Sequence, residues 1–169
     1  MSRFANVCVS HAQEAVVRYS EEQVNSWRNI MLIDRPEELK VGIAEYKVAR
    51  APVKIITLGL GSCVGITLFD PTNKIGGMVH IMLPDSTQFQ NISNPAKYAD
   101  LGIPLLMEEL LKCGANRLAL QAKIAGGAQM FSFTDRTTTL NIGQRNAEMA
   151  KLTLSKLNIR LLAEDTGKN

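Results

Sequence analysis

Two β-type runs joined by a tight turn constrain the fold of this chain most strongly. Residues 64–69 (VGITLF) and 75–83 (IGGMVHIML) are rich in β-branched and apolar side chains, which favour strands. Between them, residues 70–73 (DPTN) carry proline at a preferred turn position. The sequence therefore predicts an antiparallel hairpin whose second strand ends at Pro84.

Other segments around this hairpin indicate the fold class. A helix is expected from Asn94, which with Pro95 resembles a helix start, to Gly114, which would end it. Pro104 predicts a kink or a restart inside this helix. Further strands are expected at 41–48, 53–58, 117–124 and 159–163, and a second helix at 145–157. Because strands come first and then alternate with helices, the sequence predicts an α/β (α+β) layered sandwich, with mixed β-sheets covered by helices.

The first 40 residues are interpreted as an N-terminal extension. Ser20 and Gln23 match a capping box, and apolar residues follow at helical spacing, so residues 20–33 are expected to form an amphipathic helix. Residues 41–169 are expected to form a single domain that carries the chemistry. The role of the extension stays open.

Composition excludes several classes of protein. The net charge is +3 and the basic residues are scattered, which argues against a nucleic-acid footprint. Three cysteines without a CxxC pair, and only two histidines, predict neither a structural zinc site nor a disulfide framework. No apolar run approaches the roughly 20 residues that span a bilayer, and no signal peptide is evident. We therefore expect a cytoplasmic protein that is not membrane-embedded and uses no metal or other cofactor.

Cys63 and His80 form a candidate reactive pair across the hairpin. If pairing is symmetric about the turn, they face each other with Cβ atoms about 4.5–5.5 Å apart. A register shifted by two residues makes them diagonal neighbours at roughly 7–8 Å, and a shift of one places them on opposite faces. Gly76 and Gly77 are candidate positions for a bulge that would cause such a shift.

The chemistry of this pair is that of a nucleophile and its base. An imidazole that accepts the thiol proton lowers the pKa of the thiol, and the thiolate attacks an amide carbonyl. The glycine-rich loop 59–63 offers backbone N–H groups to the oxyanion, with Ser62 and the N–H of Cys63 as the candidates. Thr57 and Ser62 are candidates to orient the histidine, and Asp85 follows it closely. Taken singly, each residue also fits a purely structural role, since cysteine and histidine on apolar strands are commonly core residues.

Seven segments, taken in order, resemble the CheD family of chemoreceptor glutamine deamidases. Each is weak alone, but together with the cysteine and histidine they are specific. They cover most of the chain: VGIAEYKVA (41–49), TLGLGSCVGITLFDP (57–71), MVHIMLPDS (78–86), KYADLGIPLLMEEL (97–110), KIAGGAQMF (123–131), NIGQRN (141–146) and LLAEDTG (161–167).

The resemblance implies a fold, a site and a reaction. Family members are similar to a bacterial toxin deamidase, a layered α/β sandwich with a Cys–His–Thr triad. On this sequence the triad maps to Cys63 as nucleophile, His80 as base and Thr57 as the residue that orients the histidine. The implied substrates are glutamine side chains of methyl-accepting chemotaxis receptors, deamidated in chemotaxis adaptation. The implied partner is a CheC-type phosphatase.

Other functions fit the same residues. The chain could act mainly as a binding module that modulates a CheC phosphatase, with the triad little used. It could also be a receptor methylesterase, because the same thiolate chemistry serves an ester and an amide. A scaffold with an inactive site is a third alternative.

Overall fold

The computed structural model describes residues 38–129 and 142–167, which form seven strands, two α-helices and two 3-10 turns. In chain order these are β1 (Glu38–Val41), β2 (Tyr46–Arg50), β3 (Lys54–Thr57), β4 (Val64–Asp70), β5 (Ile75–Ile81), η1 (Pro95–Lys97), α2 (Ala99–Lys112), η2 (Arg117–Ala119), β6 (Gln121–Gly126), α3 (Ile142–Lys156) and β7 (Arg160–Thr166). β1 begins slightly before the domain boundary expected at residue 41. The helix expected at 20–33 lies outside the described residues.

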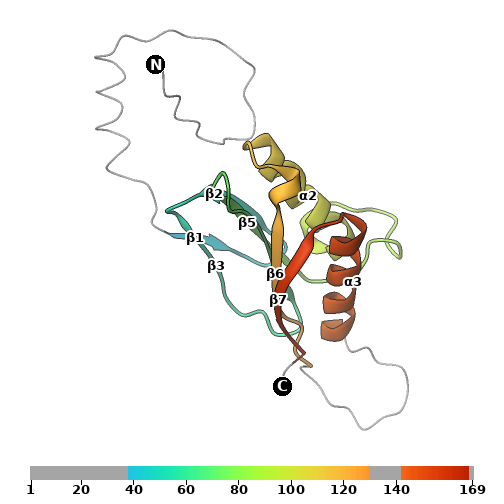
Figure 1. Ribbon diagram of the computed structural model, residues 1–169. Helices are drawn as coiled ribbons and strands as arrows, with labels where there is room; N and C mark the ends of the chain where they lie inside the picture. The colour runs from blue at the N-terminus through green and yellow to red at the C-terminus, as the bar shows by residue number, and fades with distance from the viewer. Residues whose placement is uncertain (1–37, 130–141, 168–169) are drawn as a thin grey trace, which may run out of the picture.

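Two sheets and two helices are stacked in layers. The central sheet has five strands in the order β2-β5-β4-β6-β7, and the second sheet pairs β1 with β3. In the central sheet β7 runs parallel to β6, and the other neighbours are antiparallel. Helices α2 and α3 lie on one side of the central sheet and the β1–β3 sheet on the other (Figure 1). The mixed sheets and covering helices confirm the expected fold class.

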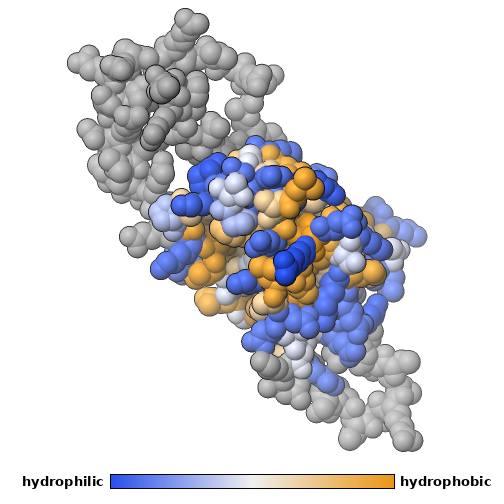
Figure 2. Space-filling view, viewed as in Figure 1, coloured by the Kyte–Doolittle hydropathy of each residue, from blue (hydrophilic) through white to orange (hydrophobic). Residues whose placement is uncertain are grey.

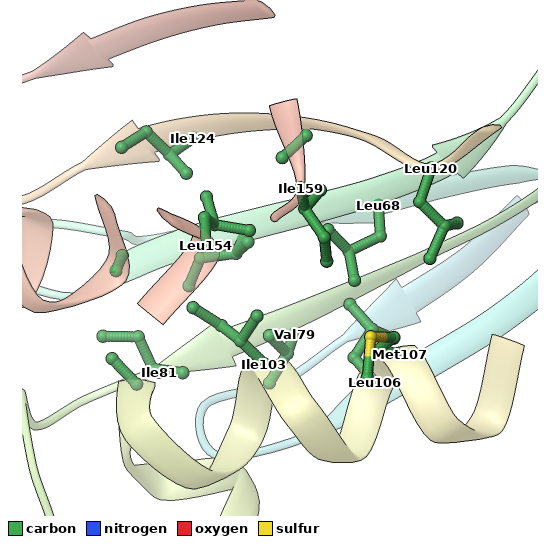
Figure 3. Close-up of a cluster of buried hydrophobic side chains, with 14 of the residues drawn as sticks. Leu68, Val79, Ile81, Ile103, Leu106, Met107, Leu120, Ile124, Leu154 and Ile159 are labelled. Atoms are coloured by element: carbon green, nitrogen blue, oxygen red, sulfur yellow. The ribbon is translucent and has the colours of Figure 1, made fainter. Parts of the chain in front are cut away.

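The hydrophobic core lies between the central sheet and the helices. Strand residues alternate between two faces, and on β4 and β5 the alternate apolar residues are fully buried on the helix side. Figure 3 shows these side chains packed against those of α2 and α3. The members drawn and labelled there include Leu68, Val79, Ile81, Ile103, Leu106, Ile124 and Leu154. The other face of β4 and β5 lies toward the β1–β3 sheet (Figure 1).

The segment after β5 differs from the single helix expected over residues 94–113. Asn94 does act as a cap, because its side chain accepts a hydrogen bond from the N–H of Ala96, but it begins the short turn η1. The backbone is then extended at Tyr98, which forms a parallel bridge with Leu83, and this pairing interrupts the helix. α2 continues through Pro104, so the helix restarts before this proline and not at it.

Two expected strands have different limits for local reasons. The strand expected at 41–48 is divided into β1 and β2, because the backbone turns at Ala44, whose φ is 57°. The strand expected from residue 117 begins at Gln121, because η2 precedes it and is capped by the side chain of Asn116. Within the described ranges, no helix is long and apolar enough to cross a membrane.

Candidate active site

The register of the hairpin, continued one residue past its last pair, places Cys63 diagonal to His80. In the β4–β5 pair, Gly65 lies opposite His80, and Val64 lies opposite Ile81. This register is shifted by two residues from the symmetric one, so Cys63 does not face His80 directly. Strand alternation still brings Cys63, two residues before Gly65, to the face that carries His80.

A four-residue turn held by Asp70 explains the shift. The Asp70 carboxylate accepts hydrogen bonds from the N–H groups of Thr72 (2.8 Å) and Asn73 (3.1 Å) and from the Asn73 amide (2.7 Å). Lys74 completes the turn with a φ of 55°. A fourth bond comes from the N–H of Asn116 at 2.7 Å. Burial would raise the pKa of Asp70, but these hydrogen bonds outweigh it and lower the pKa to about 2.

Thr57 on β3 connects the second sheet to His80. Its Oγ1 lies 2.8 Å from Nδ1 of His80 and 2.7 Å from the carbonyl oxygen of Val41. The carbonyl can only accept, so the single hydroxyl proton goes to Val41. The hydroxyl oxygen therefore accepts a hydrogen bond from Nδ1–H. This arrangement assigns the Nδ1–H tautomer to His80 and leaves the lone pair on Nε2.

His80 is fully buried, and hydrogen bonds hold both its ring and its backbone. Its side chain has no exposed surface, and its Nε2 has no hydrogen-bond partner within the described residues. The backbone of His80 is held as well, by the N–H of Ala44 (2.8 Å) and the carbonyl of Glu45 (3.0 Å). Burial lowers the pKa of His80, because the charged imidazolium is poorly solvated there. Nε2 is thus kept neutral and able to accept a proton.

Cys63 is a half-buried free thiol at the start of β4. Its N–H donates to the carbonyl of Leu60 at 2.7 Å, and its carbonyl accepts from the N–H of Gly127 at 2.8 Å. Burial raises the pKa of the Cys63 thiol. Together with the lowered pKa of His80, this favours a neutral thiol and a neutral imidazole at rest, whereas the sequence interpretation expected a lowered thiol pKa.

The two candidate oxyanion donors differ in their hydrogen bonds. The N–H of Cys63 is already donated to Leu60, so this group would have to share or break that bond to reach an oxyanion. The N–H groups of Gly61 and Ser62, by contrast, have no acceptor in the part of the chain that the structure describes. Gly61 has a φ of 48°, a left-handed conformation that favours glycine. Ser62 is therefore the better placed of the two expected residues.

The glycines at the end of β6 support the glycine-rich loop 59–63, called the nucleophile loop below, and sequence reasoning missed this role. A side chain at Gly126 would overlap the carbonyl oxygen of Cys63. The next two N–H groups hold the loop, from Gly127 to Cys63 and from Ala128 to Gly61, both at 2.8 Å. Two successive glycines after a strand are a signal of close backbone approach, and this signal was present in the sequence.

Two polar residues near the site behave differently from what the sequence suggests. Asp85 does not contact His80; it accepts a hydrogen bond from Thr87 and lies 3.9 Å from the guanidinium of Arg145. Asn146, to which no role was assigned, contacts the carbonyl oxygens of Ser62 and Met82. No local sequence pattern reveals the contacts of Asn146, since its partners are distant in the chain.

The surroundings of the site include exposed apolar side chains. Figure 2 shows apolar side chains gathered between hydrophilic ones on one face of the molecule. Close to the triad along the chain, Leu58 is 74% exposed next to Thr57, and Met82 is 41% exposed two residues after His80.

A family model and the relatives by sequence agree on one family. Residues 82–169 match the family model described as CheD chemotactic sensory transduction. A protein of Desulforamulus reducens is 59% identical over 132 residues, which is 78% of this chain and 80% of the relative. A protein of Moorella thermoacetica is 62% identical over 138 residues, 81% of this chain and 83% of the relative. Both are named probable chemoreceptor glutamine deamidase CheD.

A more distant likeness exists among solved structures. The Bacillus licheniformis hypothetical protein YfiH superposes with a TM-score of 0.49 and 12% identity, over 85% of this chain and 68% of that chain.

A third relative by sequence is a protein of Clostridium novyi, also named probable chemoreceptor glutamine deamidase CheD. It is 54% identical over 133 residues, 79% of this chain and 82% of the relative. The relatives by sequence therefore carry the family assignment.

Proposed function

The chain belongs to the CheD family, and from that premise we propose that it is a protein-glutamine deamidase acting on methyl-accepting chemotaxis receptors. The names of its relatives support the reaction. The observation that carries the mechanism is the contact between Thr57 and His80, which leaves Nε2 of His80 basic on the face that Cys63 shares.

The first step forms a thioester. Nε2 of His80 accepts the proton of the Cys63 thiol while Sγ attacks the carboxamide carbon of the glutamine, and the carbonyl electron pair moves to oxygen. Because the resting pair is neutral, proton transfer accompanies the attack. The N–H of Ser62 is the proposed donor to the oxyanion. When the carbonyl re-forms, the C–N bond breaks, and Nε2–H of His80 protonates the nitrogen, which leaves as ammonia.

The second step releases glutamate. Nε2 of His80 takes a proton from a water molecule, whose oxygen attacks the thioester carbon, and the C–S bond then breaks with return of the proton to sulfur. Thr57 accepts from Nδ1–H throughout, so the same nitrogen of His80 acts as base and acid in both steps. The balance is glutamine plus water giving glutamate plus ammonium, since the new carboxylic acid loses its proton to the ammonia.

The biological setting is part of the same proposal. A receptor is a protein substrate, and the exposed Leu58 and Met82 near the triad suit docking of a protein. Action in chemotaxis adaptation, a cytoplasmic location and regulation by a CheC-type phosphatase follow from family membership as proposals.

The test is deamidation of a purified receptor fragment. We expect ammonia release and conversion of glutamine to glutamate by peptide mass spectrometry, both abolished in Cys63→Ala. Leu118→Ala, which alters a side chain that is 93% exposed and outside the site, serves as the matched control and should keep full activity. Full activity in Cys63→Ala would refute the mechanism. Methanol release from methylated receptor without ammonia release would identify a methylesterase instead.

A further inference from the structure

A single buried side chain joins the two segments that carry the reacting groups. Asn146 on α3 has no exposed surface. Its amide nitrogen donates to the carbonyl of Ser62 at 2.9 Å and to the carbonyl of Met82 at 3.1 Å. Ser62 directly precedes the nucleophile, and Met82 follows the base by two residues. One amide group thus contacts both sides of the candidate active site.

The contacts of Asn146 lie where the β4–β5 ladder ends. The last paired residues toward the site are Val64 and Ile81. Beyond them the two backbones no longer pair with each other. The N–H of Met82 donates to the carbonyl of Lys97 at 2.9 Å, and the N–H of Cys63 donates to the carbonyl of Leu60. The side-chain amide therefore links the two segments just past the point at which backbone pairing stops, one residue beyond Ile81 and two residues before Val64.

The orientation of this amide is determined by its partners. Both partners are carbonyl oxygens, which only accept, so the NH2 group must face them and uses both of its protons. The close packing of α3 brings it within reach, because a side chain at Gly143 would overlap the carbonyl of Gly127. Burial of a primary amide is unfavourable unless it is hydrogen-bonded, and the two bonds satisfy the amide nitrogen of Asn146. Its Oδ1 is buried without a hydrogen-bond partner among the described residues.

We propose that Asn146 is a positioning residue that sets the spacing between Sγ of Cys63 and Nε2 of His80. This inference rests on the proposed function, because it assigns a task within the same site. Loss of the amide leaves two carbonyls unpaired and releases the nucleophile loop from the end of β5. A misplacement of about 1 Å between reacting groups costs on the order of 10²-fold in rate. Asn146 touches the backbone and not the substrate, so kcat falls while KM changes little.

The experiment compares Asn146→Ala with Thr153→Ala in the full chain. Thr153 is also polar and buried on α3, but its side chain forms no hydrogen bond with the site residues that the structure describes, which makes it the matched control. We expect Asn146→Ala to lower kcat for receptor deamidation about 100-fold at nearly constant KM, and Thr153→Ala to leave both unchanged. A fall in kcat that only follows the folded fraction, measured by thermal melting, would overturn the proposal.

A second measurement needs no receptor. The rate at which iodoacetamide alkylates Cys63 is followed by peptide mass spectrometry with and without His80→Ala. We expect His80→Ala to change this rate in the native chain but not in the Asn146→Ala background, because the pair is already uncoupled there. The proposal would be overturned if the two substitutions changed the alkylation rate by independent factors that multiply in the double variant. It would also be overturned if His80→Ala had no effect on this rate in the native chain. The alkylation rates test the role of Asn146 whether or not the native chain releases ammonia. Absence of ammonia release would count against the deamidase proposal alone.

A further variant covers the case in which Asn146→Ala does not fold. Asn146→Ser keeps a hydroxyl that donates to at most one of the two carbonyls, within a smaller side chain. We expect it to fold, to lose at least about tenfold in kcat and to weaken the effect of His80→Ala on alkylation. Retention of native kcat and native coupling in a folded Asn146→Ser variant would overturn the proposal.

Discussion

Thr57 Oγ1 lies 2.8 Å from Nδ1 of His80, and this contact determines which nitrogen of the imidazole is basic. The hydroxyl proton is donated to the carbonyl of Val41 at 2.7 Å, so the hydroxyl presents only an acceptor to the histidine. Val41 is the residue directly opposite Thr57 in the β1–β3 pair. The small second sheet therefore does more than cover the central one, because its register controls the tautomer of His80.

The first prediction concerns the Thr57 hydroxyl. Thr57→Val keeps the shape of the side chain but removes the acceptor for Nδ1–H, so the Nε2–H tautomer becomes populated. We expect kcat for deamidation to fall on the order of 10²-fold, while Thr57→Ser retains most of the activity. Thr67→Val is the control, because Thr67 also donates to a backbone carbonyl, that of Lys123, but lies outside the site. Equal activity of Thr57→Val and Thr57→Ser would contradict the assignment.

The second prediction concerns the pH dependence of the reaction. Burial lowers the pKa of His80, so Nε2 is protonated, and lost as a base, only at a pH below the ordinary value of about 6.5. The rate constant kcat/KM, which reports the free enzyme, should therefore stay constant as the pH falls to about 6.5 and decrease only below it. A decrease centred above pH 7, measured in constant ionic strength, would contradict this.

The thiol gives a companion prediction on the alkaline side. Burial raises the pKa of Cys63, so less thiolate is present at neutral pH than in an ordinary cysteine. We expect alkylation of Cys63 by iodoacetamide to be slower at pH 7 than alkylation of a cysteine in a short unfolded peptide, and to accelerate with pH beyond the ordinary value of about 8.5. Rapid alkylation of Cys63 at pH 6 would instead indicate a thiolate–imidazolium pair.

Asp70 yields a prediction about stability. Its folded pKa of about 2 lies below the value of about 3.9 for an unfolded chain. Its stabilising contribution is therefore fully present above that unfolded value and is lost as the pH falls toward 2. Asp70→Asn places an NH2 group against N–H donors, and we expect the free energy of unfolding at pH 7 to drop by about 2 kcal/mol. Urea denaturation should show a smaller difference between the two proteins at pH 3 than at pH 7; an equal difference would contradict the assignment.

The sequence predicted the elements of this fold better than their register. Alternating β-type runs and turn residues located the hairpin, but its four-residue turn spans residues 71–74, one residue later than the turn expected at 70–73. Its position depends on Asp70, which also accepts the N–H of Asn116, a contact between residues far apart in sequence. The break before α2 has a similar origin, because Tyr98 bridges to Leu83. Local patterns contain no information about either pairing.

The residues of the candidate site also differ in how far the sequence predicted them. Cys63 and His80 were found from the hairpin geometry together with the chemistry of their side chains. Thr57 could be named only as one of two local candidates until the resemblance singled it out, since the contact across sheets is invisible in one sequence. Asn146 was missed altogether, because it contacts residues 84 and 64 positions away in the chain. The residues proposed to react were more accessible to local sequence reasoning than the residue proposed to position them.

The last prediction tests how strictly the nucleophile loop depends on Gly126. Its φ is 107°, and an added Cβ would overlap the carbonyl oxygen of Cys63. Gly114 has a similar φ of 91° with nothing near the position of a Cβ, so Gly114→Ala measures the backbone strain alone, about 1–2 kcal/mol. We expect Gly126→Ala to cost clearly more in urea denaturation and also to change the alkylation rate of Cys63, which Gly114→Ala should not affect. Equal destabilisation by the two variants, with unchanged Cys63 reactivity, would mean that the loop accommodates a side chain and that close contact with β6 does not hold the nucleophile.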